Sequence, residues 1–252
     1  WEINNVITVE KNDKYWDRDN VRLNEVNFYP YSDNQAEERA FRGGLLHVTY
    51  TVPTSKIEKY QNTKPEIISV APYLGTYYYV INIRKAPLNN LKLRRALSLA
   101  IDRKSLAEHV VKGGRLPAYS FTPPGTAGYT AAAYLKEDIE EARRLLAEAG
   151  YPGGKGLPAF EIMYNTSNRN RKIAEAIQEM WRKNLNVTVE LVNKDWKVYL
   201  DTFRTKNYTI AGCSWIGDYA DPNTFLDMWV SGSGNNRAGW SNKQYDKLIK
   251  EA

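Results

Sequence analysis

Cysteine and histidine, which often form disulfides or bind metals, are scarce in this sequence. It has one cysteine, Cys213, and two histidines, His47 and His109. A single cysteine cannot form an internal disulfide. The histidines are far apart and have no cysteine or acidic partner at the spacing of metal ligands. We therefore expect no disulfide, no metal site and no bound cofactor.

Long apolar runs and a targeting segment are also missing. No run approaches the ~18 apolar residues that a membrane-spanning helix needs, and no signal peptide is present. The first residue is Trp1 rather than methionine, and the chain ends within the helical pattern of 242–252. Both ends therefore suggest a piece cut from a longer protein.

The common catalytic and nucleotide-binding motifs are absent. The sequence contains no G-x-S-x-G elbow, no P-loop and no G-x-G-x-x-G fingerprint. The glycine-rich stretch 153–156 does not have the P-loop spacing and precedes a predicted strand, so it indicates a loop. These absences argue against a hydrolase of the common serine type and against nucleotide binding.

The composition is that of an ordinary globular protein with a basic surface. The 252 residues carry a formal net charge of +6, but Lys and Arg are scattered and interspersed with acids. A solvated surface explains this better than nucleic-acid binding, so we expect no nucleic-acid partner. There are 18 Tyr and 7 Trp against 6 Phe, and such side chains suit a wet cleft that holds organic ligands. Most of them are still expected to serve packing.

The first third of the chain mixes short strands and helices. Alternation of apolar and polar residues predicts strands, and capping residues followed by amphipathic runs predict helices. The helix over 33–42 is expected to begin at the cap Asp33. We predict strands over 3–9, 21–29, 46–50 and 76–83, and helices over 33–42 and 55–62.

The remainder favours an α/β fold. Helices are predicted over 91–101, 102–112 and 137–149, with a long irregular segment over 115–134. Strands and helices then alternate: strand 160–165, helix 168–184, strand 187–193, helix 195–206 and strand 208–215. This alternation predicts βαβ units and a partly parallel sheet.

The stretch 211–222 joins a buried strand to two acids at its carboxyl end, where open α/β sheets bind ligands. Asp221 precedes Pro222, which predicts an N-cap and first turn for a helix over 223–229. Asp218 is then left as a single carboxylate. A single carboxylate is not enough for hydrolysis by a paired acid and base, but it can bind an ammonium group. The alternative is that Asp218 is a solvated acid in a turn without a binding role.

Several short strings follow one another in a recognisable order along the chain. They are 72–79 with Asn82, 93–97 with 100–103, 117–119 with 122–124, 145–151, 164–167, and Trp215 with Asp218-Tyr219 and Asp221-Pro222. Together they resemble the oligopeptide-binding proteins of bacterial ABC importers (extracellular solute-binding family 5), and the resemblance covers nearly the whole chain.

The resemblance implies a periplasmic-binding-protein-like fold (type II, cluster C), in which two main lobes close over the ligand. Residues 1–81 would be a remnant of the first lobe with a hinge strand. Residues 82–252 would be most of the third lobe, a mixed sheet flanked by helices, truncated at its end. No enzymatic activity is implied.

The implied function is capture of oligopeptides in an interlobe cleft and delivery to the transmembrane subunits of an ABC permease. The full-length protein would be a monomer, periplasmic or lipid-anchored at the cell surface. Asp218 would receive the peptide's α-amino group beside Tyr219. Ser214–Ile216 would pair with the peptide backbone, and Trp215 and Trp196 would line the cleft. With one lobe largely missing, we expect this chain alone to bind peptide weakly or not at all.

The sequence departs from the family pattern where short-peptide relatives carry basic residues near the bound carboxylate. The corresponding positions are Gly212, Asn170 and Phe203. These departures leave open longer peptides, or compensation by Arg169 or Arg171. The alternatives are another solute (a dipeptide, metal chelate or oligosaccharide) and, less favoured, a hydrolase that uses Asp218 and Asp221.

Overall fold

The computed structural model describes residues 5–71 and 73–251. The chain divides into two compact units between Ile68 and Ser69. This division falls earlier than the expected boundary after residue 81. The reason is that strand β3 (Gly75–Ile81) pairs along its whole length with β6 (Ile210–Ile216), so its main-chain hydrogen bonds bind it to the second unit.

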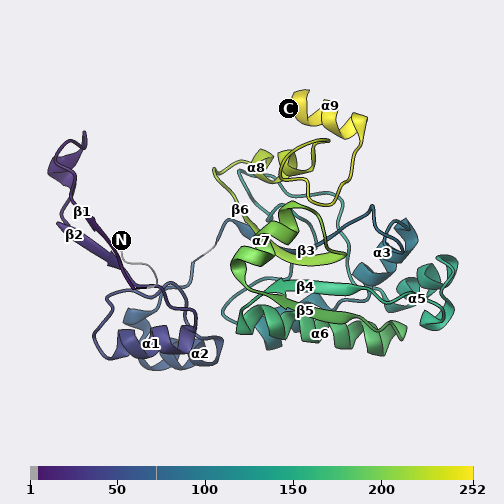
Figure 1. Ribbon diagram of the computed structural model, residues 1–252, viewed down its shortest axis with the longest axis horizontal. Coiled ribbons are helices and arrows are strands. Elements are labelled where there is room, and N and C mark those ends of the chain that lie inside the picture. The colour runs from purple at the N-terminus through teal and green to yellow at the C-terminus, as the bar shows by residue number, and fades with distance from the viewer. Residues whose placement is uncertain (1–4, 72, 252) are drawn as a thin grey trace. The chain divides into compact units, whose positions relative to one another are not determined.

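The first unit contains a two-stranded sheet and two helices (Figure 1). Strands β1 (Ile7–Glu10) and β2 (Glu25–Phe28) are antiparallel and confirm the predicted strands in part, since residues 3 and 4 lie outside the described residues. The helices are α1 (Asn34–Arg42) and α2 (Thr54–Thr63), with short 3-10 turns η1 (Arg18–Asn20) and η2 (Pro65–Ile67). The Asp33 carboxylate accepts from the Ala36 N–H, which confirms the predicted cap.

The predicted strand over 46–50 is wrong. Its residues form no ladder, and Val48 and Tyr50 are 80% and 92% exposed. The Tyr50 N–H donates to the Glu37 carboxylate rather than to a neighbouring strand. Local alternation alone could not reveal that a helix side chain takes this main-chain bond.

The second unit is built on a four-stranded mixed sheet in the order β3-β6-β4-β5. Strand β4 (Glu161–Asn165) is parallel to both β5 (Glu190–Lys194) and β6, whereas β3 is antiparallel to β6. Helices α6 (Asn168–Leu185) and α7 (Trp196–Arg204) connect the parallel strands in sequence. The predicted βαβ alternation and partly parallel sheet are therefore confirmed.

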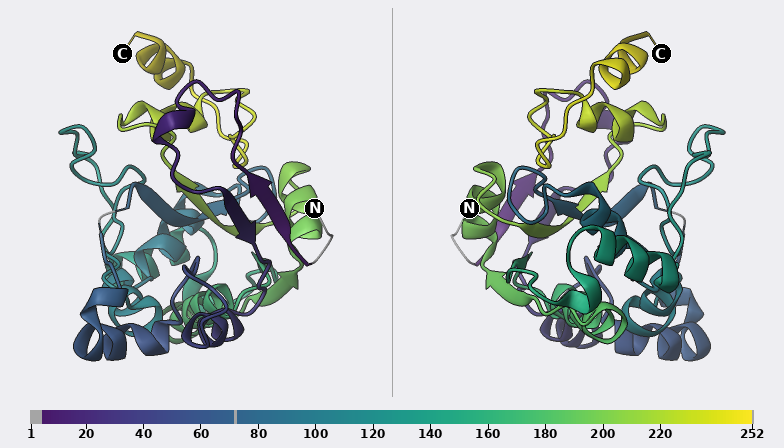
Figure 2. Two further views of the ribbon diagram at one scale, coloured as in Figure 1. Left: turned by 90° about the vertical axis from the view of Figure 1, so that its left-hand side faces the viewer. Right: turned by 90° about the vertical axis from the view of Figure 1, so that its right-hand side faces the viewer.

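Helices cover both faces of this sheet, as Figure 1 and Figure 2 show. Alternate residues of β4 point to opposite faces. Ile162 and Tyr164 belong to a core shared with α3 (Leu91–Leu99), α5 (Ile139–Glu148) and α6, whereas Met163 packs with Tyr199 of α7. The apolar stripes of the helices are buried on these faces. Because β4, β5 and β6 are parallel, their carboxyl ends lie at the same end of the sheet.

The remaining elements follow the predicted pattern with shifted limits. The predicted helix over 102–112 is α4 (Arg103–Ser105) followed by the π-helical η3 (Leu106–Val111). β5 begins three residues later than predicted, at Glu190, because the Val187 N–H still bonds to Trp181 at the end of α6. The other elements are η4 (Pro152–Gly154), α8 (Asn223–Leu226), η5 (Asp227–Trp229) and α9 (Lys243–Glu251). None of the helices within 5–71 and 73–251 is long and apolar enough to cross a membrane.

Asn82 ties the end of β3 to the start of β6. Its side chain is 3% exposed, and Nδ2 donates to the carbonyl oxygens of Lys206 (2.9 Å) and Tyr208 (3.2 Å). We expect Asn82→Ala to lower the free energy of unfolding by about 2 kcal/mol, because the carbonyl groups of Lys206 and Tyr208 lose the hydrogen bonds that the Asn82 side chain donates. Urea denaturation followed by circular dichroism measures the change.

Asn207→Ala is the matched control for this prediction. Asn207 is exposed and its side chain only accepts from Lys85 Nζ at 3.1 Å. Its loss is expected to cost less than about 1 kcal/mol. Equal effects of the two substitutions would contradict the structural role of Asn82.

Candidate ligand-binding site

Strand β6 has an open edge over its second half. It pairs with β3 from Ile210 to Ile216, but with β4 only through Ile210 and Ala211. In the part of the chain that the structure describes, no strand pairs with 212–216 on the β4 side. The carboxyl half of β6 can therefore accept a further strand.

The main-chain groups on this edge can be assigned from the ladder. The Gly217 N–H donates to the Leu74 carbonyl at 2.9 Å, so Gly217 continues the pairing toward β3. Main-chain groups alternate in direction along a strand. Trp215 therefore also faces β3, and Ser214 and Ile216 direct their N–H and C=O groups to the open edge. The Gly212 carbonyl agrees with this assignment, because it accepts from the Tyr199 hydroxyl of α7.

Asp218 lies just beyond the end of β6 and is exposed. Its main-chain N–H donates to Thr224 Oγ1 at 3.0 Å. Trp215 Nε1 donates to the carbonyl of the same threonine at 2.6 Å, and Thr224 is only 2% exposed. Thr224 thus holds two of the predicted site residues in place. The sequence reasoning missed it, because nothing in the local pattern marks a threonine inside a short helix.

Asp221 serves the start of α8. The predicted N-cap is wrong by one residue, because Pro222 rather than Asp221 is the N-cap of α8. The Asp221 Oδ1 still accepts from the Asn223 N–H at 2.8 Å. The predicted helix over 223–229 is α8 followed by η5. Because this carboxylate satisfies a helix N–H, the structure gives no support to a catalytic pair of Asp218 and Asp221.

A second acid near Asp218 is one that the sequence reasoning missed. Burial raises the pKa of Asp227 above its ordinary value, and the negative charge of Asp218 raises it further. Asp227 is the first residue of η5 and precedes the buried Met228. The negative charge of Asp218 thus acts on a second carboxylate, in η5, and a cation near both would relieve the repulsion.

The other predicted aromatic residues are Trp196, the first residue of α7, and Tyr219, which follows the end of β6. Trp196 is 59% exposed and stacks on Tyr199, with ring centroids 5.8 Å apart and planes at 7°. Since Tyr199 bonds to Gly212, this stack connects Trp196 to β6. Tyr219 is 49% exposed, and its hydroxyl accepts from Asn223 Nδ2 at 3.3 Å.

The three positions at which the sequence departs from the family pattern have structural roles. A Cβ at Gly212 would lie 2.5 Å from the Tyr77 hydroxyl oxygen, so that ring occupies the side-chain space. Asn170 is buried and donates to Asn165 Oδ1 at 2.8 Å. Phe203 stacks between Tyr199 and Tyr208. None of these positions supplies positive charge.

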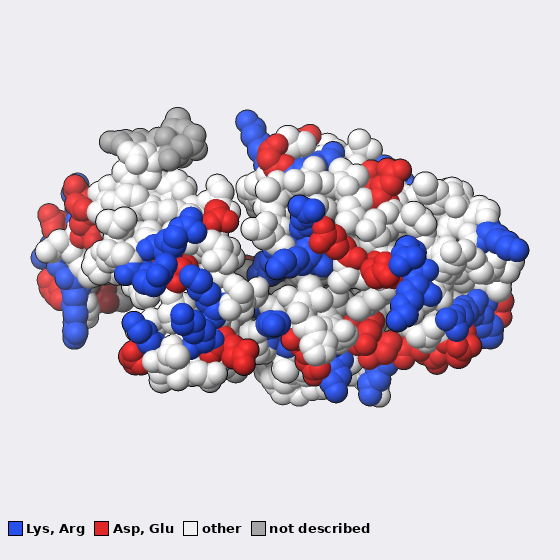
Figure 3. Space-filling model, turned by 90° about the horizontal axis from the view of Figure 1, so that it is seen from below, with Lys and Arg blue, Asp and Glu red and all other residues white. Residues whose placement is uncertain are grey.

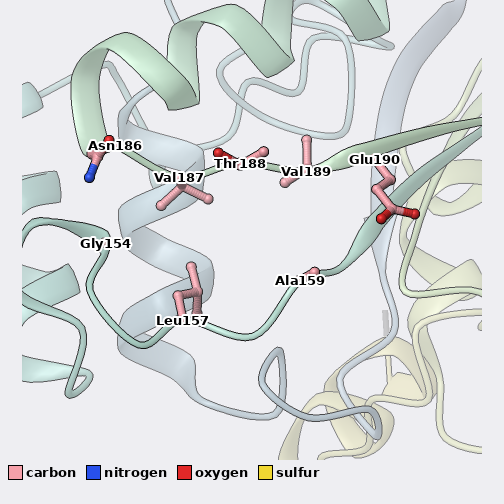
Figure 4. Close-up of a pocket in the computed structure, with 8 residues that line it drawn as sticks. All are labelled: Gly154, Leu157, Ala159, Asn186, Val187, Thr188, Val189 and Glu190. Carbon is pink, nitrogen blue, oxygen red and sulfur yellow. The ribbon is translucent and has the colours of Figure 1, made fainter.

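A small pocket lies elsewhere in the second unit. Its volume is about 210 Å³, and Figure 4 shows Leu157, Ala159, Val187 and Val189 lining it together with Glu190. These residues precede β4 or lie at the start of β5, whereas Asp218 follows the carboxyl end of β6. Because these three strands are parallel, the pocket is at the opposite end of the sheet from the open edge.

The acidic and basic side chains of the described residues bear on metal and nucleic-acid binding. Within residues 5–71 and 73–251, no group of three His, Cys, Asp or Glu side chains could hold a metal ion. Figure 3 shows Lys and Arg interspersed with Asp and Glu on the face that it draws. The charged side chains on that face do not form the continuous basic stripe typical of nucleic-acid binding.

The sequence identifies the family. Residues 1–237 match the family described as bacterial extracellular solute-binding proteins, family 5, middle region. The chain therefore belongs to family 5 of the bacterial extracellular solute-binding proteins. This family is defined by solute binding rather than by catalysis, in agreement with the non-enzymatic expectation.

Individual relatives agree with this assignment. The chain is 39% identical to the periplasmic oligopeptide-binding protein OppA of Salmonella typhimurium, over 100% of this chain and 47% of the relative. The structure of the Escherichia coli murein tripeptide binding protein MppA matches with a TM-score of 0.92 and 35% identity, over 100% of this chain and 50% of that one. Haemophilus influenzae OppA in complex with the peptide RPPGFSPFR matches with a TM-score of 0.88 and 34% identity, over 100% and 51%.

These matches confirm the expected periplasmic-binding-protein-like α/β fold. The chain spans about half the length of the curated relatives that it matches. The structural matches likewise cover about half of each solved chain.

Proposed function

We propose that the complete protein is the solute-binding subunit of an ABC importer, which captures oligopeptides and delivers them to the transmembrane subunits of the permease. The observation that carries the proposal is the open edge of β6, which ends at the exposed carboxylate of Asp218. The names of the Salmonella and Haemophilus relatives, and the peptide bound to the latter, support it.

Main-chain pairing supplies the affinity in this proposal. An extended peptide lies along β6 and exchanges hydrogen bonds with the N–H and C=O groups of Ser214 and Ile216. Every peptide presents the same main chain, so this part of the binding is independent of the ligand's sequence. Hydrated space around the ligand's side chains tolerates different residues.

Asp218 fixes the register of the ligand. Its carboxylate accepts a charge-assisted hydrogen bond from the peptide's α-ammonium group. Thr224 holds the Asp218 main chain, so the carboxylate is placed before the ligand arrives. Trp215, Tyr219 and Trp196 line the site, and Asp227 adds a second negative charge near the ammonium.

The two compact units correspond, in this proposal, to parts of two family lobes. The unit ending at Ile68 contributes part of the first lobe, and the unit from Ser69 onward contributes most of the third lobe. The complete protein acts as a monomer outside the cytoplasmic membrane, in the periplasm or anchored by lipid at the cell surface.

Native mass spectrometry of the complete protein tests the proposed function. We expect a ligand-bound species whose added mass, after release and fragmentation, corresponds to peptides of mixed sequence. A single non-peptide solute, such as a metal chelate or oligosaccharide, would contradict the oligopeptide assignment and favour another cargo of the same family.

Acid is expected to weaken the binding of peptides with a free amine. Burial and the charge of Asp218 raise the pKa of Asp227, so Asp227 loses its charge at a higher pH than an ordinary aspartate. The neutral carboxyl no longer attracts the ammonium. Affinity should therefore be full above the raised pKa and fall as the pH is lowered through it.

Calorimetric titrations between pH 7 and pH 4 measure this dependence. Asp227→Asn should remove the part of the decline that begins above the ordinary aspartate range, and an N-acetylated peptide should show little decline. The same decline for the acetylated peptide would contradict the assignment of the acids to the ammonium.

A further inference from the structure

Three basic residues from distant parts of the sequence lie at the amino end of β6. Arg84 follows β3, Lys206 lies between α7 and β6, and Arg237 lies between η5 and α9. Because β3 is antiparallel to β6, the end of β3 and the start of β6 are at the same end of the sheet. The fold therefore collects positive charges that are scattered along the chain.

Asn82 links two of these residues. Its Nδ2 donates to the Lys206 carbonyl at 2.9 Å, and its Oδ1 accepts from the Arg84 N–H at 3.2 Å. The main chains of Lys206 and Arg84 are thus bound to the two ends of one side-chain amide. Arg84 Nε also donates to the Gly239 carbonyl at 3.3 Å, which holds its guanidinium group against the loop that carries the third residue.

Arg237 is held beside Lys206 by contacts with both flanks of that residue. Its carbonyl accepts from the Tyr208 hydroxyl at 2.8 Å, and its Nη1 donates to the Arg204 carbonyl at 3.4 Å. The guanidinium carbon also lies 5.8 Å from the centroid of the Phe203 ring. The charged group of Arg237 therefore lies over the turn that contains Lys206.

These positive charges have no carboxylate partner. Among the described residues, Arg84, Lys206 and Arg237 form no ion pair, and the Lys206 ammonium group makes no hydrogen bond. Burial lowers the pKa of Lys206, and the positive charges of Arg84 and Arg237 lower it further. Like charges held together without an acid are unfavourable, and an anion bound between them would relieve that cost.

The basic group is separate from the peptide site. It precedes the amino end of β6, whereas Asp218 follows the carboxyl end. At ~3.3 Å per residue, β6 separates the two by about 20 Å. A ligand at the basic group therefore does not compete with a peptide at Asp218.

We propose that Arg84, Lys206 and Arg237 bind a phosphate group. Each guanidinium group can donate two parallel hydrogen bonds to phosphate oxygens, and the lysine ammonium adds a point charge. A phosphate has more oxygens than a carboxylate, so it can accept from all three side chains. The group can belong to a soluble phosphate compound or to a phospholipid headgroup, since both present the same oxygens. This site is additional to the proposed function.

Phosphorus NMR of inorganic phosphate, titrated with the complete protein, tests the proposal. We expect the phosphate resonance to broaden in a saturable way, with a dissociation constant in the millimolar range because the contacts are partly exposed. Lys206→Gly and Arg237→Gln should each weaken this binding roughly 10-fold, the effect of one charge-assisted contact. Lys206 has a φ of 58°, a conformation that favours glycine, so Lys206→Gly should remain fully folded.

Arg204→Gln is the matched control, because it removes a neighbouring charge that already pairs with Asp201 at 2.8 Å. It keeps the carbonyl that Arg237 contacts, and phosphate binding should stay within about 2-fold of the native value. All variants should bind peptide with native affinity, which also shows that they are folded.

Cosedimentation with vesicles identifies the source of the phosphate. Retention on phosphatidylglycerol vesicles, but not on phosphatidylcholine vesicles, that Lys206→Gly reduces would assign the group to an anionic lipid headgroup. Saturable phosphate binding without such retention would assign it to a soluble compound.

Absence of both phosphate binding and vesicle retention would overturn the inference. Binding that Lys206→Gly and Arg237→Gln leave unchanged, or that Arg204→Gln weakens equally, would also overturn it. Each of these results leaves the proposed function intact, because peptide binding is measured separately at the other end of β6.

Discussion

Asp218→Asn is expected to weaken the binding of a free-amine peptide to the complete protein roughly 30- to 100-fold, as measured by calorimetry. A hydrogen bond to a charged group is worth about 2–3 kcal/mol, which corresponds to that factor. Asparagine has nearly the same shape and keeps the main-chain bond to Thr224. The loss therefore reports the charge and not a collapse of the loop.

Asp221→Asn is the matched control for this substitution. Asn can still accept the hydrogen bond from the Asn223 N–H, so the start of α8 should persist. Affinity for the peptide should change less than about 3-fold. Equal losses in the two variants would contradict the assignment of binding to Asp218 and of a purely structural role to Asp221.

Ser214→Pro is expected to weaken peptide binding roughly 10- to 100-fold, because it removes an N–H that faces the open edge and places a ring there. The pairing with β3 uses Trp215 and Gly217 rather than Ser214, so the ladder loses no bond. The loss should be similar for free and N-acetylated peptides, because both present the same main chain.

Ser214→Ala distinguishes the contribution of the Ser214 main chain to binding from that of its side chain. It keeps the N–H, so affinity should stay within about 3-fold of the native value. Thermal unfolding followed by circular dichroism checks that the proline variant is folded. A folded Ser214→Pro protein with native affinity would show that the open edge of β6 does not pair with the ligand.

Local patterns in the sequence were enough to predict most of the second unit. The helices predicted from residues 102 and 195 begin after Asp102 and Asp195, whose carboxylates each accept a main-chain N–H of the helix that follows. Capping depends on residues within one turn, so it can be read from neighbours along the chain. The same holds for the strand predicted over 208–215, which the structure shows as β6 (Ile210–Ile216).

Contacts between distant segments could not be predicted in this way. The two units divide at Ile68–Ser69 rather than after residue 81 because β3 pairs with β6. These two strands are far apart in the sequence, so local patterns do not reveal that they pair. Thr224 bonds to Trp215 and Asp218, and Asp227 is affected by the charge of Asp218, only because the chain folds back beyond the end of β6. The Arg171–Glu175 ion pair, by contrast, follows from their spacing of four residues along one helix.

Four calorimetric titrations show whether Asp218 anchors the ammonium of a peptide paired along β6. They measure a peptide and its N-acetylated form against the native complete protein and against Asp218→Asn. We predict that the substitution weakens the free-amine peptide roughly 30- to 100-fold and the acetylated peptide less than about 3-fold. Equal weakening of both peptides, or equal affinity of both for the native protein, would contradict the account.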